Sequence, residues 1–225
     1  MIGVMEMKAK LNLNVIKTKF NNTFSNLKNI KKENIPNYLT ILRMILIVPL
    51  LILFPFMWIY KGEYSYDVGI VAFTLIIFII AMATDYVDGY LARKWNAISS
   101  FGKLWDPLAD KVITTSVLIF LSFYNIIPFW ITVIFIIRDL VVDGTRVVLN
   151  KHNINIAASF YGKLKTMVLS FAIVFVSVAY LSAPWIFNNV YWAVLLFNIP
   201  TLIALGLSLY AAFDYIYPHR HLFFK

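Results

Sequence analysis

Long apolar stretches dominate this sequence, and they constrain its fold more than any other feature. Of the 225 residues, 61% are hydrophobic and only 14% are charged, which is typical of a polytopic helical membrane protein and not of a soluble domain. A helix crosses a bilayer with roughly 20 apolar residues. We therefore predict an all-α membrane domain with about six transmembrane helices, at residues 36–60, 67–92, 105–124, 127–150, 158–182 and 189–216. Short connections are expected at 123–127 and 182–188.

The first 35 residues have a different composition from the rest of the chain. They carry seven lysines against Glu6 and Glu33, with apolar residues interleaved. They lack the continuous apolar core and small-residue cleavage site of a signal peptide. Two alternatives are open for residues 1–35: a basic amphipathic segment lying on the cytoplasmic leaflet, or a partly disordered basic tail. Residues 36–225 are expected to form the membrane domain.

The distribution of basic residues predicts the orientation of the chain. With the N-terminus in the cytoplasm and six spans, Lys61 is the only one of the 20 Lys and Arg residues in an outer loop. The positive-inside rule therefore predicts both termini in the cytoplasm, in a multi-pass protein of the cell (inner or plasma) membrane. With a net charge of +9, the protein is expected to interact with anionic lipid headgroups and phosphorylated substrates, and not with nucleic acid. The chain has no cysteine, which excludes disulfides and zinc-thiolate sites.

Four of the 11 acidic residues fall within one stretch, DYVDGYLARKWNAISSFGKLWDPLAD, as Asp85, Asp88, Asp106 and Asp110. Four carboxylates cannot all stay ionised at close range without cations, and all-oxygen ligands favour magnesium, manganese or calcium over zinc. Two metal ions about 4 Å apart would suit a phosphoryl displacement. The alternative is that the acids are helix caps, or partners for nearby Arg and Lys residues. The complete spacing favours a metal site facing the cytoplasm.

Helical spacing predicts how these carboxylates meet. Two small residues, Gly89 and Ala92, share an arc of roughly 100° with the first aspartate pair, and Arg93 lies near its edge. The second pair is four residues apart at the start of the next helix, with Pro107 expected in the first helical turn. A loop of about a dozen residues between the helices would let them run antiparallel, so that both pairs converge.

The pattern D-x2-D-G-x2-A-R-x8-G-x3-D-x3-D resembles the signature of the CDP-alcohol phosphatidyltransferases at all eight defined positions. The resemblance implies an integral membrane enzyme of about six helices, usually a homodimer, that transfers a phosphatidyl group from a CDP-linked lipid to an alcohol and releases CMP. It implies that the four aspartates bind two divalent ions, Mg²⁺ or Mn²⁺. Asp106 and Asp110 would be catalytic, with Asp110 taking the proton of the attacking hydroxyl. Gly89, Ala92, Arg93 and Gly102 would belong to the CDP-lipid site.

The first apolar helix begins with IPNYLTILR, in which Pro36, Thr40 and Arg43 share one face and Asn37 lies beside them. An arginine in an apolar helix is costly unless it meets an anion or an acid. We therefore predict that Pro36, Asn37, Thr40 and Arg43 line the nucleotide and phosphate pocket. The alternative is a simple helix start, with Pro36 at its first position and Arg43 paired to an aspartate of the second helix.

The choice of acceptor depends on a second basic cluster, in RDLVVDGTR and YGKLKT, which consists of Arg138, Arg146, Lys163 and Lys165. An acceptor that carries a phosphate requires such a cluster. The alternative is membrane anchoring, with salt bridges to Asp139 and Asp143.

Within the family, this combination most resembles the bacterial branch that makes phosphatidylglycerol phosphate from CDP-diacylglycerol and sn-glycerol 3-phosphate. By that resemblance Arg138 and Lys165 bind the acceptor phosphate, with Arg146 and Lys163 beside them; Asp139 stands where that branch often has glutamate. Inositol phosphate, phosphatidylglycerol and serine are alternative acceptors. A divalent-cation transporter is the alternative from another class, although transport sites usually lie near the bilayer midplane.

Overall fold

The computed structural model describes residues 35–60, 62–95, 100–151, 160–189 and 191–218, and in these ranges the chain forms helices and no strands. The segment 1–34, predicted as a basic N-terminal region, lies outside them. The helices are α2 (Ile35–Tyr60), α3 (Tyr64–Lys94), α4 (Ser100–Phe123), α5 (Phe129–Lys151), α6 (Phe160–Ser182), α7 (Pro184–Asn189), α8 (Tyr191–Phe197) and α9 (Ile199–Ile216).

The all-α membrane fold predicted from the apolar stretches is confirmed, and the first five predicted spans correspond to α2 to α6. Four helices in the described ranges are long and apolar enough to cross a membrane, namely α2, α3, α6 and α9. The helices α4 and α5 have similar lengths, 24 and 23 residues, but each carries several charged residues toward one end. Six spans therefore remain a prediction, supported by length and composition for four helices.

The last predicted span, at 189–216, is wrong as a single helix. The helix is interrupted at Asn198, between α8 and α9, and Pro200 lies in the first turn of α9. Proline has no amide hydrogen and disfavours helical backbone in the residue before it, so a helix ends readily at this point. The predicted connection at 182–188 is likewise mostly helical, because α7 occupies it.

The prediction for Pro107 and the loop before it is also wrong. Helix α4 begins at Ser100, so Pro107 lies inside the helix, and only residues 95–99 separate α3 from α4. A proline inside a helix removes one backbone hydrogen bond, and this cost made a start close to Pro107 the simpler expectation. The earlier start places Asp106 and Asp110 in the second and third turns of α4 and not at its beginning.

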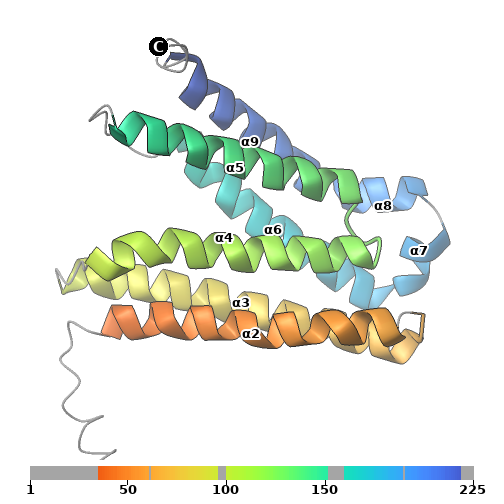
Figure 1. Ribbon diagram of the computed structural model, residues 1–225. Helices are drawn as coiled ribbons and strands as arrows, with labels where there is room; N and C mark the ends of the chain where they lie inside the picture. The colour runs from red at the N-terminus through yellow and green to blue at the C-terminus, as the bar shows by residue number, and fades with distance from the viewer. Residues whose placement is uncertain (1–34, 61, 96–99, 152–159, 190, 219–225) are drawn as a thin grey trace, which may run out of the picture.

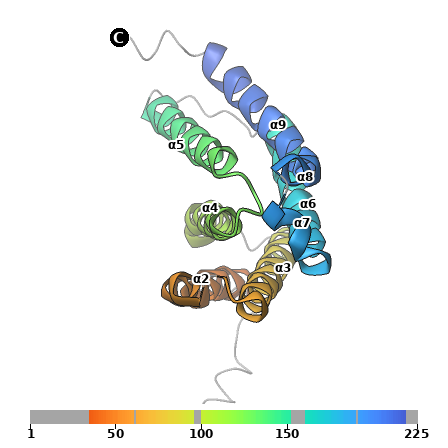
Figure 2. The ribbon, with the colours of Figure 1, turned by 90° about the vertical axis from the view of Figure 1, so that its right-hand side faces the viewer.

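The six long helices follow one another around a ring of packed neighbours. Helix α2 packs against α3, α3 against α6, α6 against α9, α9 against α5, α5 against α4, and α4 against α2. Figure 2 shows this order nearly end-on. Apolar side chains fill the contacts, including Phe78 of α3, Phe120 of α4 and Phe135 of α5, each at most 2% exposed.

Two turns set the direction of neighbouring helices at the end of the ring that lies to the right in Figure 1. Gly62, between α2 and α3, has φ +102°, and Asn125, between α4 and α5, has φ +56°. This left-handed region suits glycine and is tolerated best by asparagine among other residues. The other end of the ring lies on the left in Figure 1. Helices α2, α4 and α6 begin there, and helices α3, α5 and α9 finish there.

Candidate functional site

One turn of α2 connects the aspartates of α3 and α4 at this end of the ring. The Arg43 side chain is completely buried; its guanidinium forms an ion pair with Asp85 at 2.7 Å and a hydrogen-bonded ion pair with Asp88. The Thr40 hydroxyl donates a hydrogen bond of 2.5 Å to Asp106. Two helices, α3 and α4, therefore hold three of the four predicted carboxylates against one short stretch of α2.

Helix geometry explains this arrangement. Thr40 and Arg43 are three residues apart and so lie on the same face of α2, and the same spacing places Asp85 and Asp88 side by side on α3. The structure thus has the pairing of Arg43 with the second helix that was the alternative interpretation of IPNYLTILR. We name Asp85, Asp88, Asp106 and Asp110 together the carboxylate centre.

Asp110 lies one turn beyond Asp106 on α4 and is partly buried. Its electrostatic neighbours include Asp85 and Arg43, which belong to α3 and α2, and Lys165 and Asp139, which belong to α6 and α5. Asp110 is thus the member of the carboxylate centre that also interacts with the basic cluster of α5 and α6.

The donor chemistry of the carboxylate centre fits hard divalent cations, because every side-chain donor is an oxygen. In the described part of the chain, however, no three Asp, Glu or His side chains are gathered closely enough to hold one metal ion. The cation that Asp85 and Asp88 contact is the guanidinium of Arg43. Metal ions could be held by these four aspartates once the contacts with α2 have been exchanged.

The predicted CDP-lipid residues are described only in part. A Cβ atom at Gly89 would lie 3.8–3.9 Å from the guanidinium nitrogens of Arg93, so the arginine folds back over the glycine one turn before it. Arg93 is exposed and Ala92 is partly buried at the end of α3. The side chains of Pro36 and Asn37, and the surroundings of Gly102, lie outside the described residues.

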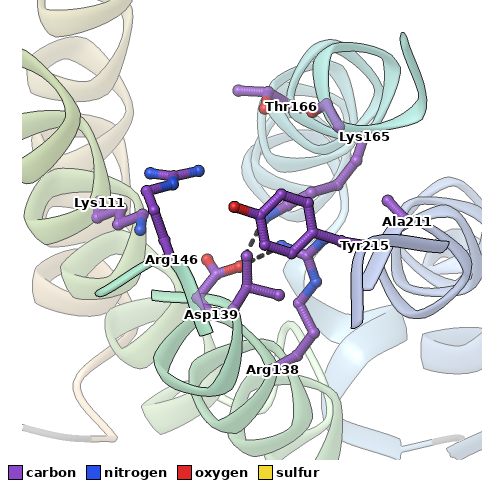
Figure 3. A pocket seen from close by; sticks show the side chains of 10 residues that line it. Lys111, Arg138, Asp139, Arg146, Lys165, Thr166, Ala211 and Tyr215 are labelled. Carbon is purple, nitrogen blue, oxygen red and sulfur yellow. Dashed lines mark hydrogen bonds and ion pairs between the residues drawn. The ribbon is translucent and has the colours of Figure 1, made fainter. Parts of the chain in front are cut away.

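A cavity of about 170 Å³ lies between α4, α5, α6 and α9. Figure 3 shows its side chains from close by. We name it the cationic cavity, because four of its lining residues are basic and one is acidic. It is lined by Lys111, Arg138, Asp139, Val142, Arg146, Gly162, Lys165, Thr166, Ala211 and Tyr215.

Asp139 holds two of the basic side chains in place. One of its oxygens, Oδ1, accepts hydrogen bonds from Arg138 and Lys165, both at 2.8 Å. The Nε atom of Arg138 donates a further hydrogen bond of 2.7 Å to the Ser208 carbonyl of α9. Lys165 is only 9% exposed, so these contacts fix both cations at the wall of the cavity.

Asp143 organises the opposite wall in the same way. It forms an ion pair with Lys111 of α4 and a longer one, of 3.9 Å, with Arg146. Figure 3 shows Lys111 and Arg146 together, across the cavity from Lys165. Lys163 is exposed and does not line the cavity.

The structure adds two residues to those found by sequence reasoning. Lys111 directly follows Asp110, so its proximity to the centre was visible in the sequence. Tyr215 comes from α9, and its place at the cavity depends on the packing of α9 against α5 and α6; no local pattern indicates it. With four basic side chains in its lining, the cavity suits a small anion such as a phosphate.

Comparisons with known proteins agree with the signature. The sequence profile described as CDP-alcohol phosphatidyltransferase matches residues 33–204. A CDP-diacylglycerol–glycerol-3-phosphate 3-phosphatidyltransferase of Mycoplasma genitalium is 40% identical over 152 residues, which cover 64% of each chain. A protein of the same name from Bacillus subtilis is 42% identical over 137 residues, 59% of this chain and 70% of the relative.

A third relative, a probable phosphatidylglycerophosphate synthase of Mycobacterium tuberculosis, is 39% identical over 140 residues, 62% of this chain and 64% of the relative. The chain thus matches somewhat less than two thirds of the length of the Mycoplasma genitalium and Mycobacterium tuberculosis proteins. The profile match covers most of the chain, including α2 to α6 and the complete carboxylate centre. The chain belongs to the CDP-alcohol phosphatidyltransferase family.

Proposed function

We propose that this protein transfers the phosphatidyl group of CDP-diacylglycerol to sn-glycerol 3-phosphate, which yields phosphatidylglycerol phosphate and CMP. The observation that carries the proposal is the cationic cavity, which adjoins the carboxylate centre through the consecutive residues Asp110 and Lys111. A negatively charged acceptor held in this cavity would lie next to a residue able to take its proton. The names of the relatives support the same reaction.

The carboxylate centre is proposed to hold two divalent ions, Mg²⁺ or Mn²⁺, through Asp85, Asp88, Asp106 and Asp110. When bound, such ions neutralise negative charge on the diphosphate and on the departing CMP. The protein's part would be to present oxygen ligands from α3 and α4 at the same end of the ring, where a lipid headgroup would lie.

Asp110 is proposed to accept the proton of the acceptor hydroxyl. The hydroxyl oxygen then forms a bond to the phosphorus of the phosphatidyl group, and the bond from that phosphorus to the oxygen of CMP breaks. Asp110 suits this role because its neighbours belong to both sites, Asp85 and Arg43 on one side and Lys165 on the other.

The cavity residues are proposed to bind the acceptor phosphate. Arg138 and Lys165 are fixed by Asp139, and Lys111 and Arg146 face them from the other wall. Phosphate oxygens can accept hydrogen bonds from several such donors at once. Binding in one orientation brings the free hydroxyl toward Asp110, which lowers the entropic part of the barrier.

The CDP-lipid is proposed to lie on the other side of the carboxylate centre. Its headgroup would contact Gly89, Ala92, Arg93 and Gly102, together with Pro36, Asn37, Thr40 and Arg43 at the start of α2. The acyl chains would remain in the bilayer beside the apolar faces of the helices. We propose that the protein lies in the cell membrane as a homodimer, with this end of the ring facing the cytoplasm.

The test is CMP release by the purified full chain in detergent with CDP-diacylglycerol and Mg²⁺. Each reaction receives one acceptor: glycerol 3-phosphate, inositol phosphate, serine or phosphatidylglycerol. We expect release with glycerol 3-phosphate alone. Release with serine or phosphatidylglycerol alone would contradict the role given to the cationic cavity, and release with inositol phosphate alone would keep that role but change the acceptor. No release with any acceptor would contradict the proposed reaction.

A further inference from the structure

Arg43 contacts two of the four aspartates that the family signature implies as metal ligands. Its side chain has no exposed surface, and its guanidinium contacts both Asp85 and Asp88. A buried guanidinium needs negative partners to offset its lost hydration, and a pair of adjacent carboxylates needs a positive one. The arginine and the two aspartates therefore stabilise one another, because the guanidinium offsets one of the two negative charges and lies between both carboxylates.

The fit of Arg43 to this position is incomplete. Its Nε atom is buried and has no hydrogen-bond partner among the described residues. A buried donor without a partner is destabilising, so this guanidinium would gain a hydrogen bond by moving to a second acceptor. A phosphate is such an acceptor, because arginine binds phosphate oxygens through two parallel N–H groups.

We propose that Arg43 is an internal counter-ion that divalent metal displaces from Asp85 and Asp88. Without a divalent ion it holds the two carboxylates together and offsets one of their two negative charges. When a divalent ion is bound, Arg43 leaves at least one of them and becomes available to the diphosphate of the CDP-lipid. The inference rests on the metal site of the proposed function, and it joins the two interpretations of IPNYLTILR as two states of one residue.

The proposal and a purely supporting role for Arg43 predict opposite changes in metal affinity when Arg43 is replaced. If Arg43 competes with metal, removing its charge strengthens metal binding, because the carboxylates are left without their cation. If Arg43 only positions the carboxylates, removing it disorders the ligands and weakens binding. Affinity for metal alone separates these cases without any measurement of turnover.

The experiment is a titration of the full chain in detergent with Mn²⁺, without substrates, following free Mn²⁺ by electron paramagnetic resonance. Arg43→Gln removes the charge and keeps a polar, though shorter, side chain. Lys94→Gln removes the same charge from an exposed position at the end of α3 and is the matched control. We expect Arg43→Gln to raise Mn²⁺ affinity roughly tenfold or more, and Lys94→Gln to change it less than about twofold, because solvent screens an exposed charge.

If the glutamine variant does not fold without metal, Arg43→Lys is titrated with Mn²⁺ in its place. Lysine retains the charge but loses the planar fork that contacts both carboxylates, so we expect a smaller rise in Mn²⁺ affinity and a metal-free melting temperature below that of the wild type. A glutamine variant that folds only when Mn²⁺ is present would support the exchange directly.

Unchanged or weaker Mn²⁺ binding by folded Arg43→Gln, or by Arg43→Lys in its place, would overturn the proposal while leaving the metal site intact. Absence of Mn²⁺ binding by the wild-type chain would instead contradict the metal site of the proposed function, and the exchange with it. The two failures are therefore distinguishable in one set of titrations.

Discussion

Two basic residues on the same helix, Lys163 and Lys165, differ in what surrounds them. Lys165 is buried beside Asp139 at the wall of the cationic cavity, whereas Lys163 is exposed and does not line it. Because the two lysines are two residues apart, helical spacing places them on roughly opposite faces of α6. Their different surroundings make them a matched pair for testing the acceptor site.

We predict that Lys165→Gln raises the KM for glycerol 3-phosphate by roughly ten- to a hundred-fold, the value of one charge-assisted hydrogen bond. Lys163→Gln should leave that KM within about twofold of the wild type, because a solvent-exposed charge contributes little. Initial rates of CMP release over a range of glycerol 3-phosphate concentrations measure both. Equal effects of the two variants would contradict the placement of the acceptor phosphate in the cavity.

At the residue scale, the sequence predicts which aspartates of the carboxylate centre lie side by side. It does not predict which residues of α2 contact them. The spacing of Asp85 and Asp88, and of Asp106 and Asp110, fixes which pairs share a helix face. The contact of Arg43 with Asp88 spans 45 positions in the sequence and depends on how α2 packs against α3. Helical spacing contains no information on that packing, so both interpretations of Arg43 stayed open until the fold was known.

At the scale of elements, the break between α8 and α9 shows how one polar residue connects two parts of the ring. Asn198 is completely buried, and its side-chain amide donates hydrogen bonds of 2.8 Å to the carbonyls of Ile126 and Val194. Ile126 belongs to the turn between α4 and α5. Asn198 therefore ties the start of α9 to the turn that directs α5, and both helices line the cationic cavity.

We predict that Asn198→Ala destabilises the protein by about 1–3 kcal/mol, because it leaves a buried carbonyl without its donor. The midpoint of thermal unfolding in detergent should fall by several degrees. Ser182→Ala is the control: the Ser182 hydroxyl bonds only to the carbonyl four residues earlier, at an exposed position, and its loss should shift the midpoint by less than about two degrees. Similar midpoints for the two variants would contradict the structural role of Asn198.

The sequence predicted the helices better than their interruptions. Apolar stretches located α2 to α6 because burial in lipid demands long, continuous helices. They could not locate the break at Asn198, since Pro200 is compatible both with a kink inside a helix and with the first turn of a new one. The predicted start of α4 was wrong for a related reason. Proline disfavours the interior of a helix, but Pro107 lies inside α4.

At the scale of the whole molecule, the residues of the two proposed sites gather at one end of the ring. The carboxylate centre and the cationic cavity both lie toward the ends of α3, α4, α5 and α6 that face left in Figure 1. The turn at Gly62 and the turn at Asn125 lie at the other end. Basic residues concentrate at this end, so the positive-inside rule predicts that it faces the cytoplasm.

The cysteine-free chain allows a direct test of this orientation. Glu63, beside the Gly62 turn, and Lys94, at the end of α3, are both exposed. We predict that Glu63→Cys reacts with a membrane-impermeant maleimide on intact cells, and that Lys94→Cys reacts only after the cells are permeabilised. The cysteine-free chain is the control for background labelling. Labelling of Lys94→Cys alone on intact cells would place the active end outside.

The most direct test of the whole account is the transfer of radiolabel from sn-glycerol 3-phosphate into lipid by the purified protein. We predict that label enters a chloroform-soluble phospholipid only when CDP-diacylglycerol and a divalent cation are both present, in a one-to-one ratio with released CMP, and that Asp110→Asn abolishes the transfer while the protein stays folded. Lipid labelling that persists in folded Asp110→Asn, or after complete chelation of divalent ions, would contradict the assignment of the carboxylate centre as the site of reaction.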